Sequence, residues 1–143
     1  MNNIVAIGND HAGLALKQML IPQIEALGFR VINLGSDSDA SVDYPDYGAQ
    51  VAEAVVSGRA RFGIAICGSG IGISIACNRT LRVRAALCHT GLMAELARKH
   101  NDANVLALGA RLIGVEEAKE CVHRFLTTDF EGGRHEQRVK KLG

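Results

Sequence analysis

The sequence predicts an α/β protein, a Rossmann-like three-layer α/β/α sandwich around a mainly parallel five-stranded sheet. Short apolar runs alternate with segments of helical periodicity along the whole chain. Two of these runs, residues 4–8 and 62–66, are typical of strands that are buried on both faces of a parallel sheet. The connections are mostly short and no linker or repeat divides the 143 residues, so residues 1–143 are expected to form one domain.

The first strand, residues 4–8, leads into a helix expected over residues 14–27, which Gly28 ends. Pro22 lies inside this helical pattern and has no backbone N–H to donate. The pattern therefore predicts a kink or a break near Ile21.

Residues 30–34 are predicted to form the second strand, and a polar loop follows at residues 35–41. The next helix is expected to begin near Tyr44 and to end near Gly58. Pro45 suits its first turn, where the missing N–H would have no partner in any case.

The third strand, residues 62–66, runs into a glycine-rich turn and a helix, and residues 84–88 are the fourth predicted strand. Thr90 is a candidate N-cap for the helix that follows. The apolar face of this helix is predicted from four residues: Leu92, Met93, Leu96 and Ala97.

The last part of the chain adds a fifth strand at residues 104–108 and a helix over residues 115–125. This helix is expected to turn Ala118, Val122 and Phe125 toward the core. A short charged helix at residues 134–141 is too polar to belong to the core, and we expect it to reach a neighbouring subunit.

Composition argues against several classes of partner. The net charge is +1, the aromatic fraction is 4% and tryptophan is absent, so neither a nucleic acid nor a membrane surface is expected as a partner. No CxxC pair or other metal-ligand cluster occurs, so no metal and no organic cofactor are expected. The chain begins as a strand, without a charged signal region, and a cytoplasmic protein with reduced thiols is expected.

The segment Ile64–Ser74 is the centre of the functional prediction. Cys67 ends a strand, and Gly68, Gly70 and Gly72 alternate with other residues at the start of a helix. Backbone amides at a helix start favour negative charge, both on a ligand and on a neighbouring thiolate. No Gly-Lys-Ser/Thr follows and the third glycine comes too early, which excludes a Walker loop and a dinucleotide fingerprint. The alternative is that Cys67 is a small buried apolar residue.

Other reactive side chains follow neighbouring strands, at the edge where a parallel sheet keeps its ligands. Asp10 and His11 follow the first strand, Ser69 lies beside Cys67, and His89 follows the fourth strand. Together they suit proton transfer. Asp10 could instead be a helix N-cap, and His89 could simply begin a helix.

Basic residues form two further groups. Arg134 and Arg138 stand four apart on one helical face and suit a phosphate dianion, with Arg111 as a third candidate. A solvated tail is the alternative for the pair. A patch of three arginines is expected to be solvated: Arg79, Arg82 and Arg84. His100 ends its helix far from the Cys67 edge, so it could join the site only from another subunit.

Five blocks of the sequence resemble the type B ribose-5-phosphate isomerases, a family that also includes galactose-6-phosphate isomerases. They are residues 8–13, 43–45, 66–72, 98–104 and 132–138, in the same order as in that family. The resemblance implies an aldose–ketose isomerase for a phosphorylated sugar, without metal or cofactor. It also implies a homodimer with shared active sites, with a tetramer as an open alternative.

The resemblance also implies roles for individual residues. Cys67 aligns with the base that moves a proton between C1 and C2, assisted by the Ser69 hydroxyl. His100 of a partner subunit and Asp10 align with the groups that open the furanose ring. Gly68, Gly70, Ile71 and Gly72 align with the loop whose backbone amides hold the enediolate oxygen. The remaining substrate contacts are implied for His11, Tyr44, Asn101, Arg111, Arg134 and Arg138, with the phosphate on the histidine and the arginines.

The substrate expected first is ribose 5-phosphate, converted to ribulose 5-phosphate through an enediolate. The alternatives are another sugar phosphate, such as allose or galactose 6-phosphate or a tetrulose phosphate, and a non-catalytic module that binds phosphosugars. The role of His89 is left open.

Overall fold

The computed structural model describes residues 2–143, and strands alternate with helices throughout that range. The strands are β1 (Ile4–Asn9), β2 (Arg30–Asn33), β3 (Phe62–Cys67), β4 (Ala85–Leu87) and β5 (Val105–Gly109). The helices are α1 (Leu14–Ala26), α2 (Tyr44–Val56), α3 (Ile71–Asn78), α4 (Gly91–Asn101), α5 (Val115–Thr127) and α6 (Glu136–Leu142). Two short 3₁₀ turns, η1 (His11–Gly13) and η2 (Gly133–His135), precede α1 and α6.

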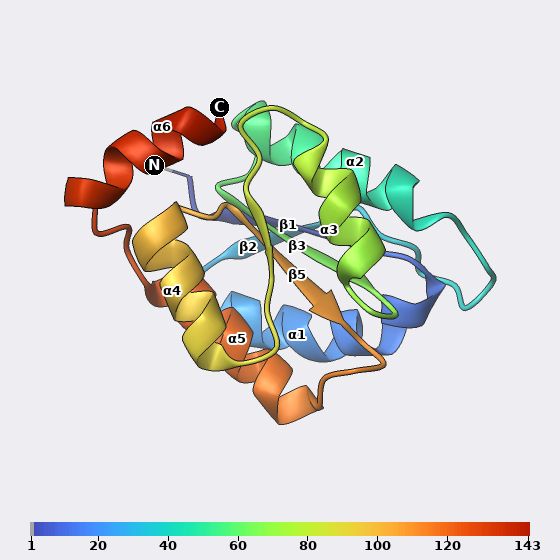
Figure 1. Ribbon diagram of the computed structural model, residues 1–143. Coiled ribbons are helices and arrows are strands. Elements are labelled where there is room, and N and C mark those ends of the chain that lie inside the picture. Colours follow the sequence, from blue (N-terminus) through green and yellow to red (C-terminus); the bar gives the residue numbers. More distant parts are fainter. Residues whose placement is uncertain (1) are drawn as a thin grey trace.

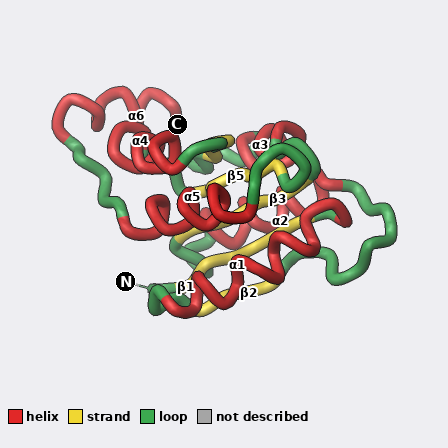
Figure 2. Tube along the Cα trace, turned by 90° about the horizontal axis from the view of Figure 1, so that it is seen from below, coloured by secondary structure: helices red, strands yellow, loops and turns green. Residues whose placement is uncertain are grey.

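The five strands form one sheet in the order β2-β1-β3-β5-β4, and every neighbouring pair is parallel. Helices α2 and α3 cover one face, while α1, α4 and α5 cover the other (Figure 1). The view from below shows the same layers with α1 in front of the strands (Figure 2). The predicted α/β/α class is confirmed, and the sheet is fully parallel.

The core follows from the alternation of side chains along β3. Phe62, Ile64 and Ile66 pack on the face that carries α1, α4 and α5. Ala65 and Cys67 point to the opposite face, toward α2 and α3. The side chains of β3 are thus buried alternately in the two helix layers, as an uninterrupted apolar strand requires.

Helix α1 runs through Pro22 without interruption, so the predicted break is wrong. Leu20 and Ile24, one on each side of the proline, are fully buried against the sheet. Their burial holds the helical path and offsets the backbone hydrogen bond that Pro22 cannot donate.

The predicted inward face of α4 is wrong for three of its four residues. Leu92, Met93 and Leu96 are 57%, 41% and 37% exposed, and Ala94 and Ala97 are the residues that pack inward. Small side chains let α4 lie close to α5, which turns the large apolar side chains outward. The predicted inward face of α5 is confirmed, since its residues 118, 122 and 125 are fully buried.

The end of the chain differs slightly from the expectation. Helix α6 begins at Glu136, and Arg134 lies in η2 just before it. No residue of α6 is buried, which agrees with the prediction that this helix lies outside the core. None of the helices in residues 2–143 combines the length and the apolar character that crossing a membrane demands.

Candidate active site

The site is built where β3 ends and α3 begins. Cys67 is the last residue of the central strand β3, is only 5% exposed and pairs with Gly109 of its neighbour β5. Gly70 then turns the chain into α3 with a left-handed φ of +77°. A Cβ at this position would lie 2.8 Å from the carbonyl carbon of Leu108 and 2.9 Å from the amide nitrogen of Gly109. The turn beside the thiol therefore requires glycine.

The same turn leaves backbone donors next to the thiol. Its path is fixed by two hydrogen bonds, from the amide of Arg111 to the Gly68 carbonyl at 2.9 Å and from the amide of Ile71 to the Ser69 hydroxyl at 3.2 Å. The amides of Ser69 and Gly70 donate to no other group of residues 2–143. Such amides at a helix start can stabilise negative charge on a bound molecule.

A cavity of about 590 Å³ opens over this turn. It is lined by Asp10, Tyr44, Cys67, Gly68, Ser69, Ile71, Gly72, Ile75, Arg111 and Leu112. The Asp10 carboxylate accepts a hydrogen bond from the amide of Ala12 at 3.0 Å and so caps η1. Asp10 therefore both caps a helical turn and lines the cavity, and its two interpretations from the sequence are compatible.

Tyr44 and Arg111 close over the glycine turn. A Cβ on Gly72 would come within 2.6 Å of the Tyr44 ring, and one on Gly68 would lie 3.1 Å from Nη1 of Arg111. The two glycines therefore allow an aromatic ring and a guanidinium group to approach the backbone beside Cys67.

The loop before Tyr44 is tied to α1 by a buried lysine. Lys17 Nζ donates to a carboxylate oxygen of Asp37 at 2.6 Å and to the Ser36 carbonyl at 2.8 Å. The hydrogen bond from Lys17 lowers the pKa of Asp37. Further along the loop, the amide of Val42 donates to Nδ1 of His11 at 3.1 Å. This bond keeps a proton off Nδ1, so the neutral His11 ring carries its proton on Nε2. His11 does not line the cavity.

The other cysteines have a different environment. Burial raises the pKa of Cys77 and of Cys121 to about 12 and that of Cys88 to about 11. These three residues remain protonated thiols at neutral pH and lie in the core.

The second group of predicted residues lies at the opposite end of the sheet. Helix α4 begins at the edge of the sheet where Cys67 lies and runs away from it for 11 residues to Asn101, a length of about 16 Å. His100 and Asn101 line a separate cavity of about 330 Å³, together with His135, Arg138, Val139 and Leu142. The two cavities share no lining residue.

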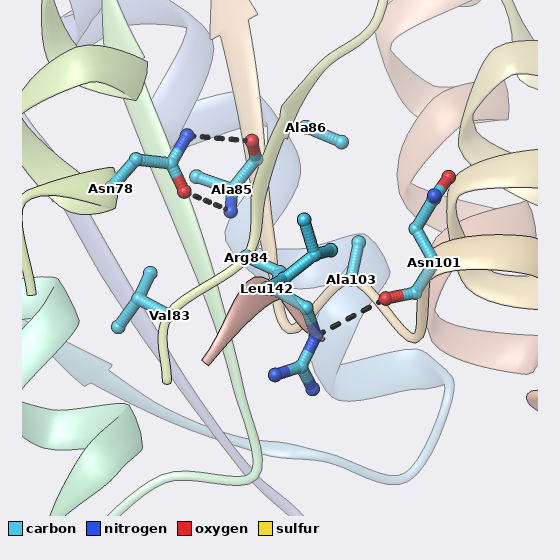
Figure 3. Close-up of a pocket in the computed structure, with 8 residues that line it drawn as sticks. All are labelled: Asn78, Val83, Arg84, Ala85, Ala86, Asn101, Ala103 and Leu142. Atoms are coloured by element: carbon cyan, nitrogen blue, oxygen red, sulfur yellow. Dashed lines mark hydrogen bonds between the residues drawn. The ribbon is translucent and has the colours of Figure 1, made fainter. Parts of the chain in front are cut away.

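The end of α4 is held by arginine contacts. Arg84 Nε donates to the carbonyls of Asn101 at 3.1 Å and Asp102 at 3.0 Å, and the first of these bonds is visible in Figure 3. The cavity in that figure, of about 430 Å³, lies between Arg84, Asn78 and the residues around Asn101. Arg84 is therefore not a solvated surface residue, as the sequence predicted, but a support for the turn that carries His100.

Some site residues had no clear sequence signal. The His135 ring stacks on that of His100, with ring centroids 4.4 Å apart and planes 16° apart. Glu131 approaches the same ring. Glu131 and His135 follow His100 by 31 and 35 positions in the sequence, so only the fold brings the three side chains together. His89, which was also predicted to lie at the Cys67 edge, is exposed before α4 and lines none of these cavities.

The chain matches the family model described as Ribose/Galactose Isomerase over residues 5–142. It is similar to ribose-5-phosphate isomerase B of Escherichia coli, with 46% identity over 138 residues that cover 96% of this chain and 93% of the relative.

Solved structures show the same likeness. The ribose-5-phosphate isomerase B of Clostridium thermocellum superposes with a TM-score of 0.96 at 48% identity, covering 98% of this chain and 95% of the other. The type B ribose 5-phosphate isomerase of Trypanosoma brucei gives 0.96 at 43% identity, covering 99% and 97%.

Proposed function

The chain belongs to the ribose/galactose isomerase family and is an aldose–ketose isomerase, and we propose that it interconverts ribose 5-phosphate and ribulose 5-phosphate with Cys67 as the base. The observation that carries the role of Cys67 is its place in the cavity, beside the amides of Ser69 and Gly70. A thiolate and uncommitted donors within one turn suit a reaction in which negative charge forms next to the base.

The proposed step moves one proton between neighbouring carbons. The Cys67 thiolate takes the proton from C2 of the open-chain aldose, and the electrons of that C–H bond form the C1–C2 double bond. Negative charge moves onto O1, where the turn amides and the Ser69 hydroxyl stabilise it. The O2 proton passes to O1, and the thiol returns its proton to C1. Aldose and ketose are at the same oxidation level, so atoms and electrons balance within the substrate.

Ring opening and phosphate binding use groups from both cavities. Asp10 lines the Cys67 cavity, whereas His100, Asn101 and Arg138 line the other one. We assign ring opening to Asp10 and His100, a substrate contact to Asn101, and the phosphate to Arg138 with its neighbour Arg134. Arg111 lines the Cys67 cavity, and we assign it to the phosphate as well, together with His11, which follows Asp10 in the chain but does not line that cavity.

A complete site therefore combines the Cys67 cavity of one subunit with the His100 cavity of a second copy. The surface around the Cys67 cavity supports this arrangement, since Ile71, Ile75 and Leu112 are 52%, 55% and 64% exposed. Large apolar side chains around a polar cavity suit a surface that another subunit covers.

Mixing two inactive variants tests the shared site. Cys67→Ala and His100→Asn each remove one group, and a mixed dimer keeps one site with neither lesion. After refolding at equal amounts, half of the dimers are mixed, so the activity should return to about a quarter of the wild-type value. If both groups came from the same subunit, the mixture would stay as inactive as its parents.

The substrate is tested by comparing kcat/KM for phosphorylated four-, five- and six-carbon aldoses. The proposal requires ribose 5-phosphate to be preferred. A higher kcat/KM for a hexose 6-phosphate or a tetrose phosphate would replace it with one of the alternatives named above.

A further inference from the structure

Three residues with metal-binding side chains meet beside the second cavity. One ligand atom each from His100, Glu131 and His135 lies within 4.8 Å of the other two. The amide of Glu131 donates to the Lys99 carbonyl at 3.1 Å and so ties this segment to the end of α4, while the amide of His135 donates to the Gly132 carbonyl at 3.1 Å within the η2 turn. The backbone that carries the three side chains is therefore held in place by the fold.

His135 provides an independent sign of a missing partner. Its side chain is only 8% exposed, and its Nε2 atom finds no hydrogen-bond partner within residues 2–143. The nearest carboxylate oxygen, of Glu131, lies 3.6 Å away, which is too far for a hydrogen bond. A buried ring nitrogen without a partner is costly, and the carboxylate of Glu131 and the stacked ring of His100 lie beside it.

We propose that His100, Glu131 and His135 bind a divalent transition-metal ion of the Zn²⁺ type, and that this ion inhibits the enzyme. Two imidazoles and a carboxylate are a donor set that Zn²⁺ takes in proteins, with a fourth position left open. Ligand atoms about 2 Å from one ion must lie closer together than 4.8 Å, so binding needs a small contraction. Exposed Glu131 and half-buried His100 can supply it.

Inhibition follows from the stacked rings. An ion binds an imidazole nitrogen in the plane of the ring, and two nearly parallel rings cannot both direct a lone pair at the same ion. His135 is fixed by burial, so His100 must turn and give its nitrogen to the ion. His100 bound to the ion can no longer take part in opening the sugar ring. Inhibition therefore rests on the proposed function, whereas ion binding does not.

The surrounding charges limit the affinity. The positive charges of Arg134 and Arg138 lie close enough to His135 to act on it. The same arginines repel a cation, and Glu131 supplies the only carboxylate of the cluster. We expect dissociation constants of about 1–100 μM, weaker than in structural zinc sites.

Cobalt(II) absorption tests the site without reference to catalysis. The titration uses Cys67→Ala protein, so that the active-site thiol cannot supply a ligand. We expect one Co²⁺ per chain with visible ligand-field bands. Glu131→Gln, which keeps the size of the side chain, should weaken binding at least about ten-fold, since even outer-shell losses cost that much. His135→Asn should do the same.

The matched control is His123→Ala, which removes an exposed histidine on α5 and should leave the titration unchanged. The proposal is overturned if Co²⁺ does not bind below 1 mM, or if Glu131→Gln binds as the parent does. In otherwise wild-type protein, Zn²⁺ should inhibit turnover reversibly, and Glu131→Gln should shift the inhibition constant by the same factor. Binding without inhibition would refute the inhibitory role. A metal-free enzyme without turnover would count against the proposed function instead.

Discussion

Replacing Gly70 with alanine tests whether the glycine turn is required by its backbone and its surroundings. Gly70 has φ +77°, and forcing an alanine into the left-handed region costs about 1–2 kcal/mol. The added Cβ also meets three atoms, of which the Leu108 carbon at 2.8 Å and the Gly109 nitrogen at 2.9 Å belong to the backbone of β5. The backbone of β5, which is paired on both sides, cannot move aside as a side-chain end can, and overpacking of this kind costs about 1–3 kcal/mol more.

Gly28→Ala is the matched control. Gly28 has φ +93°, and no atom lies within 4 Å of an added Cβ. This variant carries the same backbone strain and the same loss of freedom in the unfolded chain, but no clash. Any excess destabilisation of Gly70→Ala over Gly28→Ala therefore measures the contact with β5.

The assay is thermal unfolding followed by circular dichroism. For 143 residues, the unfolding entropy at the midpoint is about 0.3 kcal/mol/K. Gly28→Ala should then lower Tm by about 3–7 °C and Gly70→Ala by about 7–17 °C. Gly70→Ala should also lower kcat, because the clash moves the amides beside Cys67. Equal Tm losses in the two variants would refute the packing argument, and an unchanged kcat would refute the role of the turn.

Three further variants test individual roles. Cys67→Ala should lower kcat by about two to four orders of magnitude, the usual scale for loss of a general base. The control Cys88→Ala should leave kcat unchanged. Equal effects of the two variants would contradict the role of Cys67 as the base. Arg134→Ala should raise KM for the phosphorylated substrate by about 10–100-fold, as expected for lost charge-assisted hydrogen bonds. Arg79→Ala, at an exposed arginine, is the control and should leave KM unchanged. An equal loss of affinity for the unphosphorylated sugar would count against a phosphate contact of Arg134. His100→Asn should reduce turnover of ribose 5-phosphate far more than turnover of a tetrose 4-phosphate, which cannot close a furanose ring; equal losses would exclude ring opening.

The fold was predictable because its signals are local. Uninterrupted apolar runs such as residues 62–66 can be satisfied only by burial on both faces, and the turns between elements are short. The rim of the site was predictable for a related reason. Parallel strands end at one edge, so Asp10, Cys67 and Ser69 had to lie near one another once the strands were known.

The predictions that were wrong concern features that depend on packing between segments far apart in the sequence. Helix α4 has two possible inward faces, and the sequence favoured the one with larger apolar residues. Packing against α5 instead selected Ala94 and Ala97, because close approach needs small side chains. Likewise, the stacking of His100 on His135 depends on how the chain after α5 returns past α4, which no local pattern encodes.

The last helix connects the fold to the proposed assembly. Helix α6 has seven residues, none of them buried, and isolated helices of that length are marginal in water. It carries Arg138 and borders the His100 cavity, whereas the Cys67 cavity has an exposed apolar rim. Within residues 2–143, helix α6 buries no side chain, and the large apolar side chains around the Cys67 cavity are exposed. A second copy would cover both surfaces with one contact. We therefore expect the order of α6 and the activity to depend on dimerisation in the same way.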